Sequence, residues 1–483
     1  MNLLLIGMLN NKYILYYIIK TLFIYNKYIN KFYMSNRQQQ TNKLKDRLRQ
    51  KLEDKNIKTT NSNNTSKRGV KKICLTMIVK NESKNMVRLL NSLIGVIDMI
   101  SIVDTGSTDD TEKIIYDWGK EHNIVTKVHN EPFKNFAYNR THSIQKAKET
   151  YKDADYFLLS DADFIWEKDI GVKFDKVLLV DQKYLVEQYN KMLRYWNIRL
   201  LSAKVEWECV GVTHEYWKEC AKQSEYKGDI RISKISTLAI NDQEDGGCKT
   251  DKFTRDEKLL KDGLEDKETP EDLKTRYKFY LAQTLKDMGR FDESIEWYEK
   301  RIDDGGWAEE IYHSKFQLGV CNEQLGWHKK RTVEFLGKDE RKKEEDEYIK
   351  KWNSNEMSVG ELLEEANENF SKAGESYLDA YNHRNTRAEA LYNMTKMYRM
   401  LGLNDMAYKY AVIGNTIKYP KEDTLFIEKA CYDFLFDLEL SIISFYIPGE
   451  KDIGRQATSR LLTNENLPEH IYKMVEANSR HYI

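Results

Sequence analysis

Proline is scarce in this chain, with only 5 in 483 residues. Proline-rich linkers are therefore excluded, and much of the chain is open to helix because proline interrupts helices. Six cysteines are scattered along the sequence, and no two form a Cys-x-x-Cys pair. This pattern argues against a zinc site and against a disulfide framework. It favours a reducing compartment, so we expect a cytoplasmic protein.

An excess of charge of one sign is also lacking, because 77 Lys and Arg balance 77 Asp and Glu. A neutral chain has no overall field that attracts nucleic acid or an anionic membrane surface. We therefore predict that nucleic acid is not a partner. The length of 483 residues is enough for two or three domains, each with its own core.

A clean apolar run of membrane-spanning length is missing as well. Residues 1–33 are rich in apolar side chains, but polar residues at 10–12 and at Lys20 interrupt them. No small-residue cleavage site follows, as a signal peptide requires. Two alternatives remain for this leader, a membrane anchor or a gene-model extension ahead of a natural start at Met34. Residues 34–70 are rich in Gln, Asn, Lys, Ser and Thr, and we expect a disordered tether there.

Apolar runs and helical periodicity alternate from residue 71 to 250. A β-α-β-α-β-α-β order predicts a parallel, doubly wound sheet, which binds ligands at the carboxyl ends of its strands. The expected strands are 74–79, 99–103, 124–128 and 155–159, and the expected helices are 86–93, 111–119 and 136–148.

Two carboxylates follow the last of these strands. The apolar run Tyr156–Leu159 ends at Ser160 and is followed by Asp161 and Asp163. Residues i and i+2 of an extended chain point to the same side, so the two acids would converge. Oxygen donors of this kind suit a hard cation such as Mg²⁺ or Mn²⁺. The alternative is a solvated acidic turn.

Two further side chains are placed for ligand binding. Asp104 leaves the second strand, where its carboxylate could accept from a ribose hydroxyl or a base N–H, and Gly106 permits a tight turn beneath it. The alternative is an ordinary turn, with Ser107 or Thr108 as the N-cap of the next helix. Arg140 precedes the acidic strand and could reach a diphosphate, or form only a surface ion pair.

Four motifs in this order and spacing resemble those of family-two glycosyltransferases. They are Val-Lys-Asn-Glu at 79–82, Val-Asp-Thr-Gly-Ser-Thr-Asp at 103–109, Asn-Arg at 139–140 and Leu-Ser-Asp-Ala-Asp at 159–163. The resemblance covers roughly residues 72–250, and it implies the GT-A fold, an α/β domain that binds a nucleotide sugar. It also implies that Asp104 binds the nucleoside and that Arg140 lies near the base or the phosphates. Asp161 and Asp163 would hold the diphosphate through a divalent metal, Mn²⁺ or Mg²⁺.

A later segment, residues 207–215, is similar to the family's Gly-x-x-His-Glu element. The similarity implies that His214 is a metal ligand and that Glu215 is the catalytic base of an inverting transfer. Other candidate bases lie in the loop Asp242–Asp245. Gly246 and Gly247 follow this loop.

The Gly pair and two lysines after it could form a mobile loop that closes on phosphates. These lysines are Lys249 and Lys252, and Lys252 is assigned to nucleotide-sugar binding. The alternative is a flexible linker between domains.

Residues 251–483 read as helices, with small and aromatic residues at tetratricopeptide-like spacing. Gly289 and Gly326, which occupy equivalent positions, are 326 − 289 = 37 residues apart. A charged insertion at 329–354 separates the two helices of one repeat. Generic helical packing is the alternative. We expect an all-α domain that holds a peptide acceptor or forms a homodimer.

Taken together, the sequence predicts a metal-dependent, inverting glycosyltransferase. Its partners would be a nucleotide-sugar donor and a protein, peptide or glycan acceptor. The alternative is a catalytically inactive nucleotide-binding protein whose helical repeats mediate interactions.

Overall fold

The computed structural model describes residues 69–190, 194–220, 226–246, 252–336, 358–465 and 467–482. The chain divides into two compact units, Met1–Asp251 and Lys252–Ile483. The predicted leader at 1–33 lies outside the described residues, as do nearly all of the predicted tether and most of the charged insertion.

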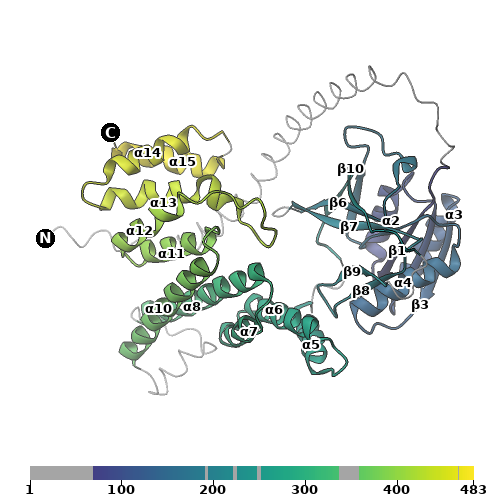
Figure 1. Cartoon of the computed structure of the whole chain (residues 1–483), viewed down its shortest axis with the longest axis horizontal. Helices are drawn as coiled ribbons and strands as arrows, with labels where there is room; N and C mark the ends of the chain where they lie inside the picture. Colours follow the sequence, from purple (N-terminus) through teal and green to yellow (C-terminus); the bar gives the residue numbers. More distant parts are fainter. Residues whose placement is uncertain are drawn as a thin grey trace. The chain divides into compact units, whose positions relative to one another are not determined.

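The first unit is built on a sheet (Figure 1). This sheet has eight strands, in the order β3-β2-β1-β4-β7-β6-β10-β5. Strands β1 to β4 are mutually parallel, whereas β7 runs antiparallel to both β4 and β6. β8 and β9 form a separate hairpin. The strands are β1 Ile73–Val79, β2 Met99–Asp104, β3 Val125–Asn130, β4 Tyr156–Leu159, β5 Phe164–Lys168, β6 Lys183–Tyr189, β7 Arg194–Ser202, β8 Trp207–Val210, β9 Tyr216–Glu219 and β10 Ile232–Asp242.

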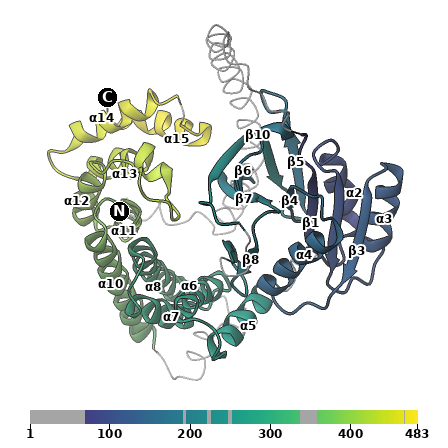
Figure 2. The ribbon, with the colours of Figure 1, turned by 45° about the vertical axis from the view of Figure 1, so that its right-hand side comes forward.

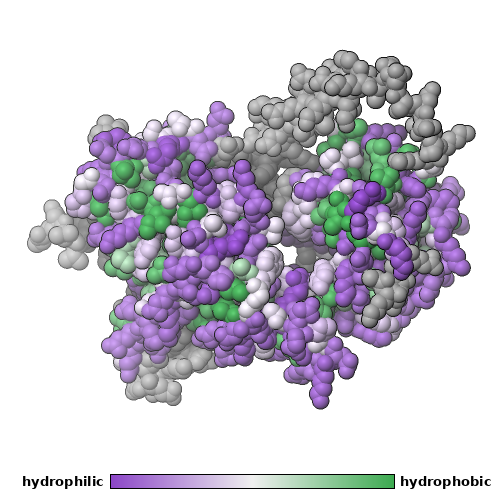
Figure 3. Space-filling view, viewed as in Figure 1, coloured by the Kyte–Doolittle hydropathy of each residue, from purple (hydrophilic) through white to green (hydrophobic). Residues whose placement is uncertain are grey.

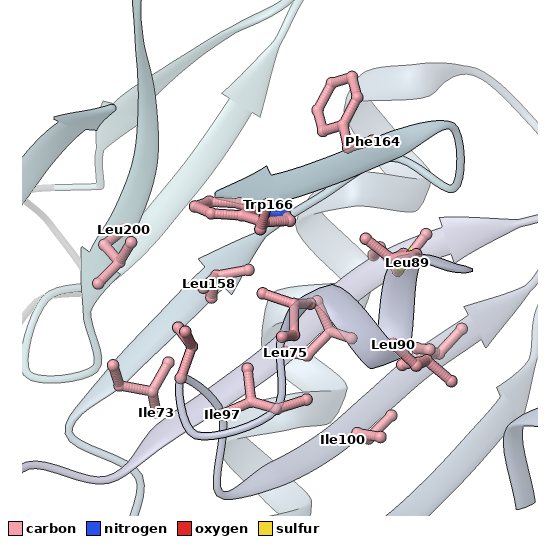
Figure 4. Close-up of a cluster of buried hydrophobic side chains, with 14 of the residues drawn as sticks. Ile73, Leu75, Leu89, Leu90, Ile97, Ile100, Leu158, Phe164, Trp166 and Leu200 are labelled. Carbon is pink, nitrogen blue, oxygen red and sulfur yellow. The ribbon is translucent and has the colours of Figure 1, made fainter. Parts of the chain in front are cut away.

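Helices cover both faces of the parallel half of the sheet. Helix α2 (Ser83–Ser92) and helix α3 (Thr111–Glu121) share one hydrophobic cluster with Ile73, Leu75 and Leu158. Helix α4 (Phe136–Thr150) packs with Cys74 and other residues of the opposite face. Figure 4 shows the first cluster, in which side chains of β1, β4 and α2 meet. The predicted doubly wound α/β domain is confirmed.

The sheet curls strongly between β4 and β5. The two strands are four places apart in the sheet, which is about 19 Å if the sheet were flat. Only residues 160–163 connect them, and five residue steps reach about 17 Å at most. The curl brings Trp166 of β5 over the inner part of the sheet (Figure 4). There its indole N–H donates to Ser160 Oγ at 3.0 Å. The turn with Asp161 and Asp163 therefore bridges the curled sheet.

The second unit is helical, as the sequence predicts. Each helix contacts the next described one along the chain, and α8 packs along α10 (Figure 2). The helices are α5 Lys252–Glu265, α6 Glu271–Asp287, α7 Phe291–Asp303, α8 Ala308–Leu336, α10 Val359–His383, α11 Glu389–Met400, α12 Asn404–Gly414, α13 Phe436–Ile443, α14 Lys451–Leu462 and α15 Glu469–Ser479. A π-helix, Cys431–Leu435, leads into α13.

The visible surface agrees with a chain in which 32% of residues are charged. On the face shown in Figure 3, hydrophilic residues predominate and hydrophobic ones form small, separate patches. None of the described helices combines the length and the apolar character that crossing a membrane requires.

Candidate active site

Three loops meet at the carboxyl ends of β1, β2 and β4. Val79, the last residue of β1, pairs with Asp104, the last residue of β2. On the other side of β1, β4 is paired in the same direction and ends at Leu159. The loops that follow these strands therefore emerge at one edge of the sheet, where a doubly wound fold binds its ligand.

The first two loops are tied together by hydrogen bonds. The Asn81 backbone N–H donates to Ser107 Oγ at 2.9 Å, and the Thr108 N–H donates to Asn81 Oδ1 at 2.7 Å. The prediction that Ser107 or Thr108 caps the next helix is therefore wrong. Helix α3 begins after Asp110. The side chains of Ser107 and Thr108 bond to Asn81 in the neighbouring loop and not to the first turn of the helix.

Asp104 shapes the second loop from within. Its side chain is buried, and Oδ1 accepts from the backbone N–H groups of Gly106 at 2.8 Å and Ser107 at 2.6 Å. Gly106 has a φ of 109°, which only glycine adopts without strain. The carboxylate predicted to bind the nucleoside is thus held rigidly at the strand end.

Arg140 joins two of the predicted site acids. Its Nη2 lies 2.7 Å from Asp161 Oδ1, and its Nε lies 2.6 Å from Glu215 Oε1. The structure therefore brings together three residues predicted to act in one reaction. Along the chain, the first and the last of them are 215 − 140 = 75 residues apart.

Packing of α4 against the β8–β9 hairpin positions this triad. The Cys209 N–H donates to Thr141 Oγ1 at 2.9 Å, and the Phe136 N–H donates to Val212 O at 3.2 Å. These bonds anchor the hairpin loop, which carries Glu215, to the helix that carries Arg140. The loop turns at Gly211, whose φ is 108°.

A second arginine, which the sequence analysis did not single out, faces Asp161 from β7. Arg199 Nη1 lies 3.6 Å from Asp161 Oδ2, and Nη2 donates to Gln188 Oε1 at 2.6 Å. Gln188 in turn donates to Asp242 Oδ2 at 3.0 Å. This chain of contacts links Asp161 to the loop that holds the alternative candidate bases.

These contacts keep Asp161 ionised. Burial alone raises the pKa of this carboxyl, but Arg140 and Arg199 outweigh burial and lower the pKa below its usual value. Burial likewise opposes the charge of Arg140, yet Asp161 and Glu215 raise its pKa. The site therefore contains fixed charges of both signs at neutral pH.

Asp163 lies among a different set of partners. Its Oδ2 accepts from the Gly246 N–H at 3.3 Å, and a Cβ on Gly246 would come within 3.4 Å of Glu82 Oε1. Arg88 holds the same loop through two bonds to the Asp245 carboxylate, at 2.7 and 2.5 Å. The end of the loop 242–246 thus lies over the second acid of the Asp-Ala-Asp turn.

The chemistry of the two acids fits a divalent metal. Within the described ranges, no three His, Cys, Asp or Glu side chains come together as a metal-binding group. Mg²⁺ is commonly held by one or two carboxylates together with phosphate oxygens of the substrate. Asp161 and Asp163 provide such a pair, so a metal held by these residues remains a proposal.

The remaining predicted residues have other places in the chain. His214 is exposed and has a φ of 50°, in the left-handed region. Lys252 is the first residue of α5 and so belongs to the second unit. Gly247 and Lys249 are not among the described residues.

Arg199 could have been recognised from its neighbours in the sequence. It is a charged residue within the apolar run Ile198–Leu201, and a buried charge in a strand requires a partner. Gln188 takes the third buried position of β6, on the same face as Tyr184 and Val186, and nothing in its residue type marks it as part of a site.

Comparison with known proteins agrees with the geometry. Residues 74–172 match the family model described as Glycosyl transferase family 2. No curated protein matches the chain.

Among solved structures, the chain is similar to TarS of S. aureus, residues 1–349, in complex with UDP. The identity is 14%, the match covers 64% of this chain and 91% of that one, and the TM-score is 0.26. It is also similar to TTC0263, a TPR protein of Thermus thermophilus, with 14% identity, coverage of 47% of this chain and 88% of that one, and a TM-score of 0.29. Likeness at these TM-scores supports no conclusion about function.

The first unit is thus a doubly wound α/β domain with acidic loops at its ligand-binding edge. Its residues 74–172 match the model of glycosyl transferase family 2, so the resemblance found in the sequence at roughly 72–250 is confirmed over that part.

Proposed function

We propose that this protein transfers a sugar from a nucleotide-sugar donor to an acceptor, with inversion at the anomeric carbon. The observation that carries the proposal is the contact of Arg140 with both Asp161 and Glu215, at the ligand-binding edge of a domain of this family. In this arrangement Arg140, which would bind the departing diphosphate, lies next to Glu215, which would take the proton.

The transfer is a direct displacement. An acceptor hydroxyl oxygen attacks the anomeric carbon, the bond from that carbon to the diphosphate oxygen breaks, and the proton of the hydroxyl passes to the Glu215 carboxylate. Arg140 Nε is paired with Oε1 of Glu215, and Oε2 is the oxygen proposed to accept the proton. Asp104 would bind the nucleoside, and Arg140 would bind the diphosphate.

A divalent cation, Mn²⁺ or Mg²⁺, would neutralise charge on the departing diphosphate when bound. Asp161 and Asp163 are the proposed ligands. His214 and Lys252 remain proposed contacts to the metal and to the nucleotide sugar, respectively.

The loop Asp242–Asp245 is the alternative source of the base. Asp242 Oδ1 accepts from the Glu244 N–H at 3.0 Å, and Asp245 is paired with Arg88. Glu244, the third acid of the loop, accepts from the side-chain amide of Asn190 at 2.9 Å. All three acids thus have partners that shape the loop, which favours Glu215 as the base.

The acceptor is proposed to be a protein, peptide or glycan. We further propose that the helical unit, a tetratricopeptide-like array, holds this acceptor or forms a homodimer. The five cysteines among the described residues are unpaired, which agrees with work in the cytoplasm. Anchoring to a membrane through residues 1–33 is the alternative.

A screen of nucleotide sugars tests the donor class. The full chain is mixed with each donor and Mn²⁺, and a specific donor should raise the unfolding temperature because it binds only the folded state. Donors that do so are then assayed for release of nucleoside diphosphate, with and without candidate acceptors.

The variant Asp163→Ala tests the assignment of the site. We expect it to lose at least about 100-fold in turnover, since a charge that stabilises the transition state is removed. Asp117→Ala is the control, because Asp117 is exposed on α3 and pairs with Lys113 at the surface. Wild-type rates for Asp163→Ala with Mn²⁺ present would refute the proposal. Binding of a nucleotide with no turnover of any donor would favour the inactive interaction protein instead.

A further inference from the structure

Arg199 is a buried cation with more hydrogen-bond donors than partners. Only 8% of this residue is exposed. A guanidinium has five N–H donors. One donates to Gln188 at 2.6 Å, and the ion pair with Asp161 is longer, at 3.6 Å. The Nε atom is buried and makes no hydrogen bond. A buried cation with an unused donor is suited to a further anionic oxygen.

The protein fixes the orientation of this guanidinium from two sides. The Arg199 guanidinium carbon lies 4.7 Å from the centroid of the Phe164 ring, close enough for a cation–π contact. Gln188 is buried, and its amide is itself held by Asp242. A donor that is already oriented loses little entropy when it binds a ligand.

Arg199 and Arg140 approach opposite oxygens of one carboxylate. Arg140 faces Asp161 Oδ1 from α4, and Arg199 faces Oδ2 from β7. With Glu215, which also pairs with Arg140, two positive and two negative charges meet. The geometry thus places an anionic group between two guanidiniums, whose planar donors match phosphate oxygens well.

We propose that Arg199 is a second diphosphate-binding residue, and that Asp161 occupies the place between the two arginines which the diphosphate takes on binding. This inference rests on the proposed function, because it assumes a ligand that carries a diphosphate. Asp161 then has two opposed effects. It competes with the diphosphate for the arginines, and it attracts the metal that accompanies the diphosphate.

The two opposed effects predict that one variant binds pyrophosphate more tightly without metal and more weakly with metal. Asp161→Asn removes the competing charge, so the full chain should bind inorganic pyrophosphate more tightly in EDTA, by about threefold to tenfold. In MgCl₂ the same variant should bind pyrophosphate more weakly than the wild type, because a metal ligand is lost. Isothermal titration calorimetry measures both affinities.

Substitution of Arg199 tests the residue directly. Arg199→Gln should bind pyrophosphate about tenfold to a hundredfold more weakly in EDTA, the effect of losing one charge-assisted contact. Arg199→Lys keeps the charge but not the planar donors, and an intermediate affinity is expected. Arg231→Gln is the matched control and should bind as the wild type does, because Arg231 is 63% exposed at the side chain and pairs with Asp181. Circular dichroism verifies that each variant is folded.

Two results would overturn the assignment. One is a folded Arg199→Lys or Arg199→Gln variant that binds pyrophosphate as tightly as the wild type. The other is weaker pyrophosphate binding by Asp161→Asn in EDTA, which would show that Asp161 does not compete for the arginines. The proposed function is tested separately by turnover of nucleotide sugars. If the variants show the predicted pyrophosphate affinities but the wild type turns over no nucleotide sugar, the proposed glycosyl transfer is refuted and the role of Arg199 stands.

Discussion

At the scale of the residue, the choice between the two candidate bases can be decided by matched substitutions. Glu215→Gln keeps the size of the side chain but removes the proton acceptor, so kcat should fall about 100-fold to 10,000-fold. Asp242→Asn should stay within about tenfold of the wild type, because Asp242 is bound to Gln188 and to its own loop and is not the proposed base.

The measurement is kcat with saturating donor, together with donor affinity by calorimetry. Donor affinity should change little in Glu215→Gln, since the proton transfer belongs to the transition state. If kcat falls more in Asp242→Asn than in Glu215→Gln, the base belongs to the loop Asp242–Asp245.

Asp109 gives a prediction for stability against pH. Desolvation raises the pKa of this carboxyl, but hydrogen bonds from Thr111 and Ser83 outweigh it and lower the pKa to about 2, from 3.8. A carboxyl with a depressed pKa stabilises the fold above its unfolded pKa, and this contribution is lost as the pH falls through the folded value. The contribution should therefore be complete above about pH 4 and be lost towards pH 2. It should be below about 1 kcal/mol, because the side chain is exposed to solvent.

Thermal unfolding of the wild type and of Asp109→Asn measures this effect. The difference between their unfolding temperatures should be largest above pH 4 and should shrink towards pH 2. A difference that stays constant over this range would mean that the hydrogen bonds do not depend on the charge of Asp109.

The residues of the site could be predicted only in part. Strand ends place Asp104 and Asp161 at one edge of the sheet, and the resemblance to family motifs pointed to Arg140 and Glu215. The sequence could not show that Arg140 contacts two acids at once, because that contact depends on how α4 packs against the β8–β9 hairpin. Asp163 was expected to act together with Asp161. In the structure, its carboxylate accepts a hydrogen bond from the backbone N–H of Gly246.

At the scale of the element, the packing of α8 on α10 leaves no room at two glycines. A Cβ on Gly319 would overlap the Tyr377 ring, and one on Gly326 would lie 2.8 Å from the Phe370 ring. Alanine favours a helix over glycine by about 1 kcal/mol. Overpacking of a buried contact costs about 1–3 kcal/mol. We therefore expect Gly319→Ala to lower the free energy of unfolding by up to about 2 kcal/mol, although alanine is the better helix former.

Gly360→Ala is the matched control, since Gly360 lies in α10 and an added methyl group there would meet only Ser358 Oγ, at 3.8 Å. This substitution should leave stability unchanged or raise it slightly. Urea unfolding of both variants measures the two free energies. Equal stability of the two variants would contradict the close packing at Gly319.

The elements of the parallel half were predictable because apolar strands and amphipathic helices alternate there. The strand expected at 74–79 is β1 at Ile73–Val79, and the helix expected at 111–119 is α3 at Thr111–Glu121. The helix expected at 86–93 begins earlier, at Ser83. The position of β5 could not be foreseen, because strands adjacent in sequence usually lie side by side, whereas β5 lies four places from β4.

At the scale of the whole molecule, each unit has hydrophobic clusters of its own. We therefore expect two transitions in calorimetry of the full chain. A nucleotide sugar with Mn²⁺ should increase the free energy of unfolding of the first unit, which carries most of the proposed site, by about 2.7 kcal/mol at 100 times its Kd. A single transition that the ligand shifts as a whole would show that the units unfold as one.

The class of the molecule was predictable because the change from alternating strands and helices to helices alone is visible in the sequence. The structure divides the chain between Asp251 and Lys252. The tetratricopeptide-like character of the second unit stays a prediction, since the spacing of small and aromatic residues serves many helical packings.

The curl of the sheet has a consequence for the order in which the first unit folds. Residues 160–163 connect β4 to β5, but in the described sheet β5 pairs as a strand with β10 alone, and β10 begins about 70 residues later in the chain. Pairings so distant in sequence form late in folding because they close long loops. The Asp-Ala-Asp turn should therefore acquire its final shape only when β10 docks. In a refolding experiment, the ability to bind nucleotide should return with the slowest phase, after most of the secondary structure.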